Sequence, residues 1–298
     1  MKISQLFKNK NDKPIISFEI FPPKKEEAFE NVGIMLKELS YLEPKFISVT
    51  CGAGGSSNRN KTIELASKIK NEFNIESMAH MTCISSTPDS VLEEVKAIQD
   101  EGIENILALR GDIPKEGFEP EKASYSHAFE LIKEIKTNSE LCVAAGAYPE
   151  GHIECDDFNK SIEHMKIKEE AGADFFVSQL FFDNRYFYRF FEAAEKAGIT
   201  VPITPGIMPM MSKSQISNMI FMCGASLPSE MVRILYKYES SPDDLLKAGI
   251  EYAGRQISDL VKNNTCGIHL YSMNKPEIAK QLLEYCLLYT SPSPRDKR

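Results

Sequence analysis

A single carboxylate within an apolar run is the residue of this sequence best suited to chemistry. Glu19 follows Phe18 and precedes Ile20 and Phe21, a pattern that predicts a buried strand. Burial disfavours the charged form of a carboxylate, so we expect a raised pKa for Glu19. A carboxyl group of that kind is suited to donate a proton as a general acid. An ion pair with a buried lysine or arginine would explain the residue equally well, because structural ion pairs also perturb carboxylates.

Other residues with chemical potential follow further apolar runs. Thr50 ends one run and precedes the stretch 52–57, GAGGSS, where a backbone with few side chains could approach a phosphate closely. This stretch matches neither G-x-G-x-x-G nor a Walker sequence, so a flexible loop is an equally good interpretation. The remaining residues at such places are His80, Arg110, Gly111, Asp112, Tyr148, His152 and Gln179.

The other histidines and acidic residues give weaker signals. His152 is followed by Glu154 and Cys155, but their spacing is not that of the usual metal sites, and we expect no metal. His127 and His164 fall in helical stretches, and we interpret both as solvent-exposed side chains.

A regular alternation of strands and helices must position these groups. Strands are expected at residues 15–21, 46–50, 77–83, 105–109, 141–147, 175–181, 201–204 and 267–271. Helices are expected between them, at residues 26–40, 61–73, 88–101, 124–137, 159–171 and 185–197. Strands that alternate with helices of this length form βαβ units and a parallel sheet. Because the strands are nearly continuous apolar runs, helices are expected to cover the sheet.

Eight strands in 298 residues favour a closed (β/α)8 barrel, the TIM barrel, which needs roughly 250 residues. We therefore predict an α/β fold with one domain over residues 1–286. Three helical segments before the last strand, at 214–222, 229–239 and 242–262, represent the seventh helix and an insertion. Residues 287–298, LLYTSPSPRDKR, are predicted to be a disordered or non-native tail. In such a barrel the reacting groups gather at the carboxyl ends of the strands.

Composition excludes several classes of function. The net charge of −8 and the pI near 5.4 argue against a nucleic-acid-binding protein, which would carry a basic face. No run reaches the roughly 18 apolar residues of a membrane helix, and the first residues lack the apolar region of a signal peptide. Seven cysteines without a C-x-x-C pair favour reduced thiols. These features predict a cytoplasmic protein without membrane contact.

Eight segments of the sequence carry a further signal: SFEIFPPK (17–24), SVTCGAGG (48–55), AHMTC (79–83), LALRGD (107–112), AAGAYPEGH (144–152), EAGADFFVSQLFFD (170–183), PGIMP (205–209) and YSMNKPE (271–277). Together, and in this order, they resemble the methylenetetrahydrofolate reductase family, flavin-dependent enzymes of one-carbon and methionine metabolism. The resemblance implies a (β/α)8 barrel that holds FAD at its C-terminal face. It also implies reduction of 5,10-methylenetetrahydrofolate to 5-methyltetrahydrofolate by NADH or NADPH, with hydride passing through FAD in a ping-pong sequence.

The resemblance also assigns roles to residues. Glu19 corresponds to the family's general acid, and Asp112 to the aspartate beside the flavin pyrimidine and the bound pterin. Gln179 corresponds to the glutamine used in turn by nicotinamide and folate, and Lys275 stands where some members carry an arginine that faces folate. The positions that match flavin contacts, besides Asp112, are Thr50, His80, Arg110, Gly111, Tyr125, Ser126, Tyr148, His152 and Lys168.

One departure from the family concerns the segment after Pro209. Lys213 stands where well-known members place an aromatic residue that stacks on folate. A lysine cannot stack in that way, which weakens the expected contact with folate at this position.

Two other functions fit a barrel of this type. A barrel methyltransferase would bind a pterin without flavin, and a flavin- or folate-binding subunit would pass electrons to a larger complex. Some bacterial relatives work with an iron–sulfur partner subunit, and barrels of this type commonly form homo-oligomers.

Overall fold

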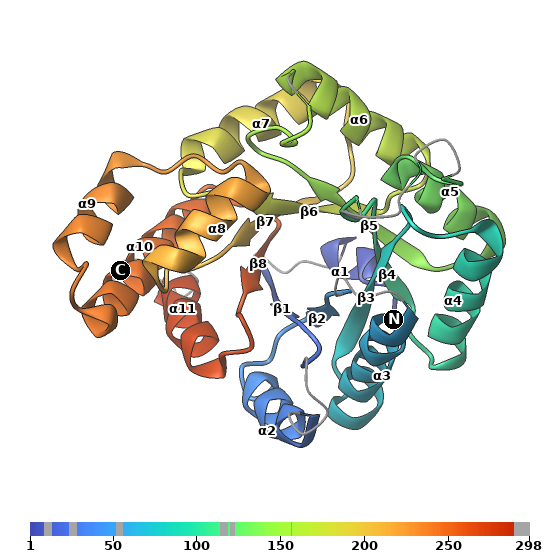
Figure 1. The fold of residues 1–298 in the computed structure, drawn as a ribbon, viewed down its shortest axis with the longest axis horizontal. Helices are drawn as coiled ribbons and strands as arrows, with labels where there is room; N and C mark the ends of the chain where they lie inside the picture. The colour runs from blue at the N-terminus through green and yellow to red at the C-terminus, as the bar shows by residue number, and fades with distance from the viewer. Residues whose placement is uncertain are drawn as a thin grey trace, which may run out of the picture.

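Eight parallel strands form a closed barrel in which each strand pairs with the next and β8 pairs with β1. The structure is a computed structural model that describes residues 1–8, 14–23, 29–51, 56–113, 119, 123–155 and 157–288. The strands are β1 Ile15–Ile20, β2 Phe46–Val49, β3 Glu76–Thr82, β4 Asn105–Leu109, β5 Cys142–Ala147, β6 Phe175–Leu180, β7 Ile203–Ile207 and β8 Gly267–Tyr271. Helices surround the ring of strands (Figure 1). The predicted (β/α)8 barrel is confirmed.

The outer layer consists of helices between successive strands. They are α2 Phe29–Ser40, α3 Ser56–Phe73, α4 Pro88–Asp100, α5 Ala128–Asn138, α6 Phe158–Glu170 and α7 Asn184–Lys196. Three helices, α8 Lys213–Cys223, α9 Ser229–Lys237 and α10 Pro242–Lys262, lie between β7 and β8, in agreement with a seventh helix plus an insertion. Within the described ranges, no helix combines the length and the apolar character needed to cross a membrane.

The last helix, α11 Pro276–Leu288, runs two residues into the segment predicted to be a tail. Residues 289–298 lie outside the described part of the chain.

Capping side chains explain several helix starts. The Thr87 hydroxyl accepts a hydrogen bond from the Ser90 N–H at the start of α4, and the Thr87 N–H donates to the Ser90 hydroxyl. Asp157 and Asp183 cap α6 and α7 in the same way, through their carboxylates. These side chains satisfy N–H groups that have no partner within the helix. Helix α5 starts at Ala128, four residues later than predicted.

Strand β7 differs from the prediction, which placed it at residues 201–204. It runs from Ile203 to Ile207 and includes Pro205 and Gly206, two residue types that are unfavourable in strands. A Cβ at Gly206 would lie only 2.4 Å from the Ser178 carbonyl oxygen of β6, and 2.7 Å from the Tyr271 ring. Glycine is therefore required here, because β7 approaches its neighbours too closely for any side chain.

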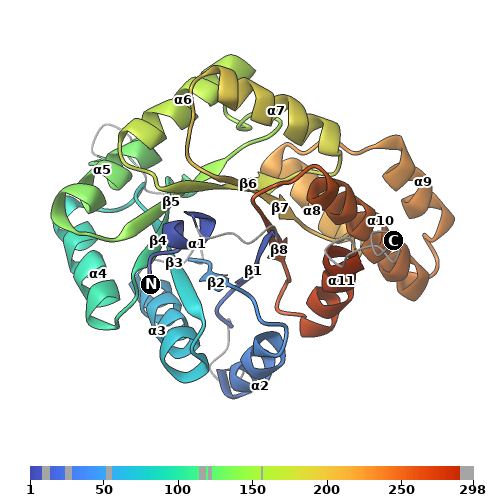
Figure 2. The ribbon, with the colours of Figure 1, turned by 180° about the vertical axis from the view of Figure 1, so that it is seen from behind.

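A short helix that the sequence analysis did not predict, α1 Ser4–Lys8, closes the amino-terminal end of the barrel. Ile3 is completely buried and packs, with Leu6 and Phe7, against interior side chains at the starts of the strands, among them Phe46 and Phe175. Figure 2 shows α1 within the ring of strands. This end of the barrel is thus filled, and a ligand site is expected at the other end.

Candidate functional site

Glu19 lies inside the barrel between two histidines. Its Oε2 is 3.4 Å from Nε2 of His80 on β3 and 3.6 Å from Nε2 of His269 on β8. The Glu19 side chain is 18% exposed and those of His80 and His269 are 6% and 0% exposed. The strand pairing produces this cluster, because β1 is bonded to β8 on one side and is separated from β3 only by β2.

The predicted raised pKa of Glu19 is wrong. Burial raises the pKa, as expected, but the hydrogen-bonding contact with His269 and the electrostatic interactions with His80 and His269 together lower it by more. The pKa of Glu19 therefore lies below its ordinary value. Burial also lowers the pKa of His80, to about 4, so that His80 is neutral at pH 7.

His269 is held rigidly beneath the carboxylate. The Ser17 hydroxyl lies 2.8 Å from its Nδ1, and its ring stacks on Phe46 with 6.0 Å between ring centroids. The sequence analysis did not single out this histidine. Its signal was a polar residue inside the apolar strand Gly267–Tyr271, the same pattern that drew attention to Glu19.

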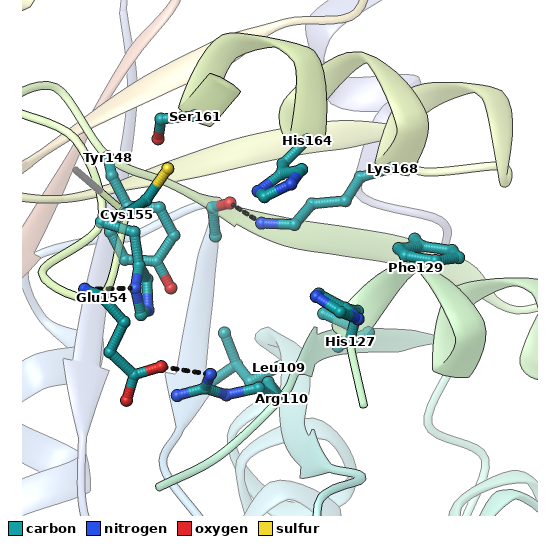
Figure 3. A pocket seen from close by; sticks show the side chains of 14 residues that line it. Leu109, Arg110, His127, Phe129, Tyr148, Glu154, Cys155, Ser161, His164 and Lys168 are labelled. Atoms are coloured by element: carbon teal, nitrogen blue, oxygen red, sulfur yellow. Dashed lines mark hydrogen bonds and ion pairs between the residues drawn. The ribbon is translucent and has the colours of Figure 1, made fainter. Parts of the chain in front are cut away.

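A cavity opens beside the barrel, between the ends of β4 and β5 and the helices α5 and α6 (Figure 3). Its volume, counted together with the open space at its mouth, is about 750 Å³. Four residues predicted to contact flavin line it: Arg110, Tyr148, His152 and Lys168. The cavity and the Glu19 cluster are separate, because neither Glu19 nor His80 belongs to the cavity lining.

Two cations, Arg110 and Lys168, face this cavity and differ in their hydrogen-bond and ion-pair partners. The Arg110 guanidinium is paired with the Glu154 carboxylate, and this interaction raises the pKa of Arg110 further. The Lys168 ammonium donates to the Gly146 carbonyl oxygen at 2.9 Å and lies 5.3 Å from the centre of the Tyr148 ring. In the described part of the chain no carboxylate pairs with Lys168, and burial lowers its pKa to about 8. A cation held in this way suits an anionic ligand.

Aromatic rings complete the walls of the cavity. The His152 ring meets Tyr148 edge-on, with 4.6 Å between centroids. Burial lowers the pKa of His152, and the Arg110 charge adds to this effect. His127 and His164, interpreted from the sequence as solvent-exposed, are exposed but line the cavity together with Phe129. Flat rings beside cations suit a ligand that combines phosphates with aromatic groups.

The turn after β4 brings the backbone close to the neighbouring strand. Gly111 has φ +87°, and a Cβ there would lie 3.0 Å from the Thr82 Cβ. Only glycine adopts this conformation without strain. Asp112 follows it and is exposed. Thr50 lies at the end of β2, where its N–H donates to the Ile20 carbonyl oxygen at 2.9 Å.

The other predicted site residues lie apart from these two clusters. Tyr125 is buried in the core, and Ser126 is exposed at the start of α5. The Gln179 side chain on β6 accepts a hydrogen bond from the Leu180 N–H at 2.8 Å, and Lys275 is exposed before α11. Within the described residues, no hydrogen bond or ion pair joins Glu19 to Asp112, Gln179 or Lys275. The glycines 52–55 lie outside the described residues.

Lys213, which replaces the expected aromatic residue, is turned toward the protein surface. Its ammonium lies 2.6 Å from the Glu239 carboxylate, and its side chain is 66% exposed. Lys213 therefore forms an ion pair at the surface, in place of the stacking contact expected of an aromatic residue.

The chain is similar in sequence to proteins named as methylenetetrahydrofolate reductases. It is 31% identical over 290 residues to methylenetetrahydrofolate reductase 1 of Schizosaccharomyces pombe, which covers 95% of this chain and 48% of that one. It is 31% identical over 264 residues to 5,10-methylenetetrahydrofolate reductase of Escherichia coli, covering 89% of this chain and 88% of that one. The chain thus spans about half the length of the fission-yeast relative and most of the length of the bacterial one.

A solved structure supports the fold. It is an uncharacterized protein from Clostridium thermocellum, described as binding two copies of 5-methyl-5,6,7,8-tetrahydrofolic acid. The TM-score is 0.67 at 16% identity, with 96% of this chain and 98% of that one covered. This likeness shows the barrel alone.

The model of the family described as methylenetetrahydrofolate reductase matches residues 2–286. The matched segment extends from before α1 into the last helix, and therefore includes every strand of the barrel. Because the match covers the whole fold that positions the Glu19 cluster and the cavity, the chain belongs to the methylenetetrahydrofolate reductase family.

Proposed function

We propose that this chain reduces 5,10-methylenetetrahydrofolate to 5-methyltetrahydrofolate, with FAD as cofactor and NADH or NADPH as the source of electrons. Membership of the family supports the reaction. The observation that carries the proposal is a buried carboxylate with two histidine neighbours inside the barrel, together with a separate cavity that is lined by cations and rings. Both lie where the strands of a (β/α)8 barrel end, the usual place of its active sites.

The cavity residues fit a flavin dinucleotide. Lys168 has an ammonium without a carboxylate partner among the described residues, and Arg110 supplies a second cation, so the pair can hold a pyrophosphate. When bound, FAD supplies hydride transfer between the reduced nicotinamide and the folate. The protein supplies binding, orientation and a proton. We assign further flavin contacts to Thr50, His80, Gly111, Tyr148 and His152.

Glu19 is the residue to which we assign the proton transfer. Opening of the five-membered ring of the substrate requires a proton on its bridging nitrogen, and a carboxyl group can donate it. Because its contacts keep Glu19 ionised at neutral pH, the carboxylate must be protonated before it can act as an acid. The Nε2 of His269, 3.6 Å from the Glu19 Oε2, lies close enough to take part in that protonation, whereas His80 is neutral at pH 7 and has no extra proton to give. Asp112, Gln179 and Lys275 are assigned to substrate binding through the family alone.

Two consecutive measurements on the purified protein test the proposal. NADH or NADPH, added separately without oxygen, should bleach the yellow absorbance of the bound flavin. 5,10-Methylenetetrahydrofolate, added next, should restore it. A colourless protein that takes up no flavin would contradict the proposal. Flavin that is bleached but not restored by the folate would indicate a subunit that only passes electrons on.

A further inference from the structure

Helix α2 carries an exposed stripe on one of its sides. Ile34 is 62% exposed, and Tyr41, directly after the helix, is 71% exposed. Lys37 and Glu38 lie between them and are exposed as well. The Tyr41 N–H still donates to the Lys37 carbonyl oxygen at 3.4 Å, so the helical spacing continues to this residue. The spacing of i, i+3, i+4 and i+7 places all four residues on one side of the helix. We call them the α2 stripe.

The opposite side of α2 packs against the barrel. Val32, Leu36 and Leu39 are buried in the core, and α3 and α11 lie next to the helix. Figure 1 shows α2 at the outer edge of the ring of helices. The fold therefore accounts for the buried side of the helix, whereas the α2 stripe contributes nothing to the core.

The side chains of the stripe have no partners of their own. Within the described residues, the Lys37 ammonium and the Glu38 carboxylate form no ion pair and no hydrogen bond, and the Tyr41 ring contacts no other ring. Adjacent residues of a helix do not face each other, so Lys37 and Glu38 do not pair with one another. Both charges are therefore available to a partner, together with the two apolar side chains.

Gly33 lies beside the stripe, one turn before Lys37. Glycine within a helix costs about 1 kcal/mol relative to alanine. A Cβ at this position would meet nothing within 4 Å, so the packing of this chain does not require the glycine. A helix surface without a side chain lets another backbone approach closely, which favours contact with a second helix at this place.

The order of residues in the stripe is complementary to itself. Each residue turns an α-helix by about 100°, which puts Ile34 and Tyr41 along the middle of the stripe. Lys37 then lies on one edge and Glu38 on the other. When two α2 helices lie side by side and parallel about a two-fold axis, Lys37 of each copy meets Glu38 of the other. A two-fold contact forms each such pair twice. Antiparallel helices would instead bring Lys37 against Lys37 and Glu38 against Glu38.

We propose that the α2 stripe is a docking surface for a second copy of this chain, which packs beside the first about a two-fold axis parallel to α2. The charges argue for a second copy, because the stripe already contains the complement of each of its own charges. A stable interface takes about 800 Å² from each partner, and the neighbouring helices α3 and α11 lie where they can add to the area of the stripe. The inference is independent of the proposed function.

The test measures the dissociation constant of the assembly by sedimentation equilibrium over a range of protein concentrations. Lys37→Glu sets two carboxylates against each other on both edges of the contact. It should raise the dissociation constant by about tenfold or more, equivalent to about 1.4 kcal/mol. The combined variant, Lys37→Glu with Glu38→Lys, restores both pairs and should associate as the wild type does. The matched control is Lys96→Glu, which makes the same change of charge at an exposed residue of α4 and should leave the dissociation constant unchanged.

A mixture of two variants gives a second readout, which a defect in folding would not produce. Lys37→Glu and Glu38→Lys, each weakly associated alone, should form mixed dimers when combined, because every pair across the axis then joins opposite charges. A monomeric wild type, or an unchanged dissociation constant in Lys37→Glu, would overturn the inference. Failure of the combined variant to regain association, or of the mixture to form dimers, would overturn it as well.

Discussion

At the amino-terminal end of the barrel the Met1 ammonium and Lys70 share the carboxylates of Glu76 and Glu104. At the carboxyl-terminal side, within the described residues, the Lys168 ammonium contacts a carbonyl oxygen and no carboxylate. The two ends also differ in filling, because apolar side chains around Ile3 fill the first and a cavity opens beside the second. One end has its charges neutralised within the protein, whereas the other keeps charge available for a ligand.

This difference separates stability from function along one barrel. Asn105, at the start of β4, accepts a hydrogen bond from the Ile3 N–H at 2.7 Å and donates to the Ser77 carbonyl oxygen at 3.1 Å. At the other end the buried Nε2 of His80 has no hydrogen-bond partner among the described residues. A buried polar atom without a partner costs about 1–3 kcal/mol. We therefore expect changes at the first end to affect stability and changes at the second to affect the reaction.

The largest effect is expected for Glu19→Gln. Glutamine is nearly isosteric and should preserve folding, but it cannot donate a proton to the folate. Oxidation of the reduced flavin by 5,10-methylenetetrahydrofolate should slow by about 10²–10⁴-fold, the usual contribution of general acid catalysis. Reduction of the flavin by nicotinamide needs no acid from the protein and should change less than about tenfold. Stopped-flow absorbance measures both steps.

Glu76→Gln at the opposite end of the barrel is the matched control, because it removes a carboxylate in the same way. It should leave both half-reactions unchanged. Equal damage to both half-reactions by Glu19→Gln would assign Glu19 a structural role.

Ile3→Ala should produce the opposite pattern. It removes a side chain that is completely buried against the interior of the strands, and substitutions of this kind typically cost about 2–5 kcal/mol. Urea unfolding should show this loss, while the rates of both half-reactions stay unchanged in the folded protein. Slower folate reduction in a fully folded Ile3→Ala variant would mean that the two ends are coupled.

The contributions of Glu94 and Glu104 to the stability of the fold should change in opposite directions as pH rises. Burial raises the pKa of Glu94, beside Arg59 on the adjacent helix, to about 7 from an ordinary value of 4.5. The folded protein thus binds this proton more tightly than the unfolded chain, and the stability present below pH 4.5 is lost as pH rises to about 7. At the amino-terminal end, the hydrogen bond from Lys70 lowers the pKa of Glu104. Its contribution is present above pH 4.5 and is lost as pH falls.

Two variants separate these contributions in urea unfolding at pH 3, 4, 5, 6, 7 and 8. Glu94→Gln should reduce the loss of stability between pH 5 and 8 by about 2 kcal/mol, since one pKa unit corresponds to about 1.4 kcal/mol. Glu104→Gln should instead lower the stability at pH 7 and 8 and weaken the loss on the acid side. The same pH dependence in both variants would refute the contrast.

Asp112→Asn should have the smallest effect. Asp112 is exposed after β4, where charges interact by about 1 kcal/mol or less through water. Removal of its negative charge should raise the midpoint potential of the bound flavin slightly and weaken folate binding, with FAD content retained. A redox titration measures the first effect. An unchanged potential together with unchanged folate kinetics would remove Asp112 from the site.

Local sequence signals predicted most of the fold. The bounds of β4, β8 and α10 agree with the prediction, because each is a continuous run between turn or capping residues. Strand β7 was misplaced because Pro205 and Gly206 are unfavourable in strands in general. The reason they are required there, the close approach of Ser178 and Tyr271, depends on residues from two other strands. Helix α1 was missed because only the interior of the barrel gives its five residues a place to pack.

The sequence pointed to some of the residues that the structure brings together, but not to their chemistry. Glu19 was found from its apolar neighbours in the sequence. The low pKa comes from His80 and His269, which the closed barrel brings to it from far along the chain. That His127 and His164 line one cavity was missed for the same reason, because His127 precedes α5 and His164 lies on α6, and only the folded chain brings them together.

The pairing of β1 with β8 has a consequence for folding. The hydrogen bond between Ser17 and His269 joins residues 252 positions apart, and contacts of such long range form late because closing so long a loop costs entropy first. Glu19 and His269 stand on opposite sides of that seam. In the proposed function, a growing chain on the ribosome therefore lacks the His269 side of the Glu19 cluster until its last strand has emerged.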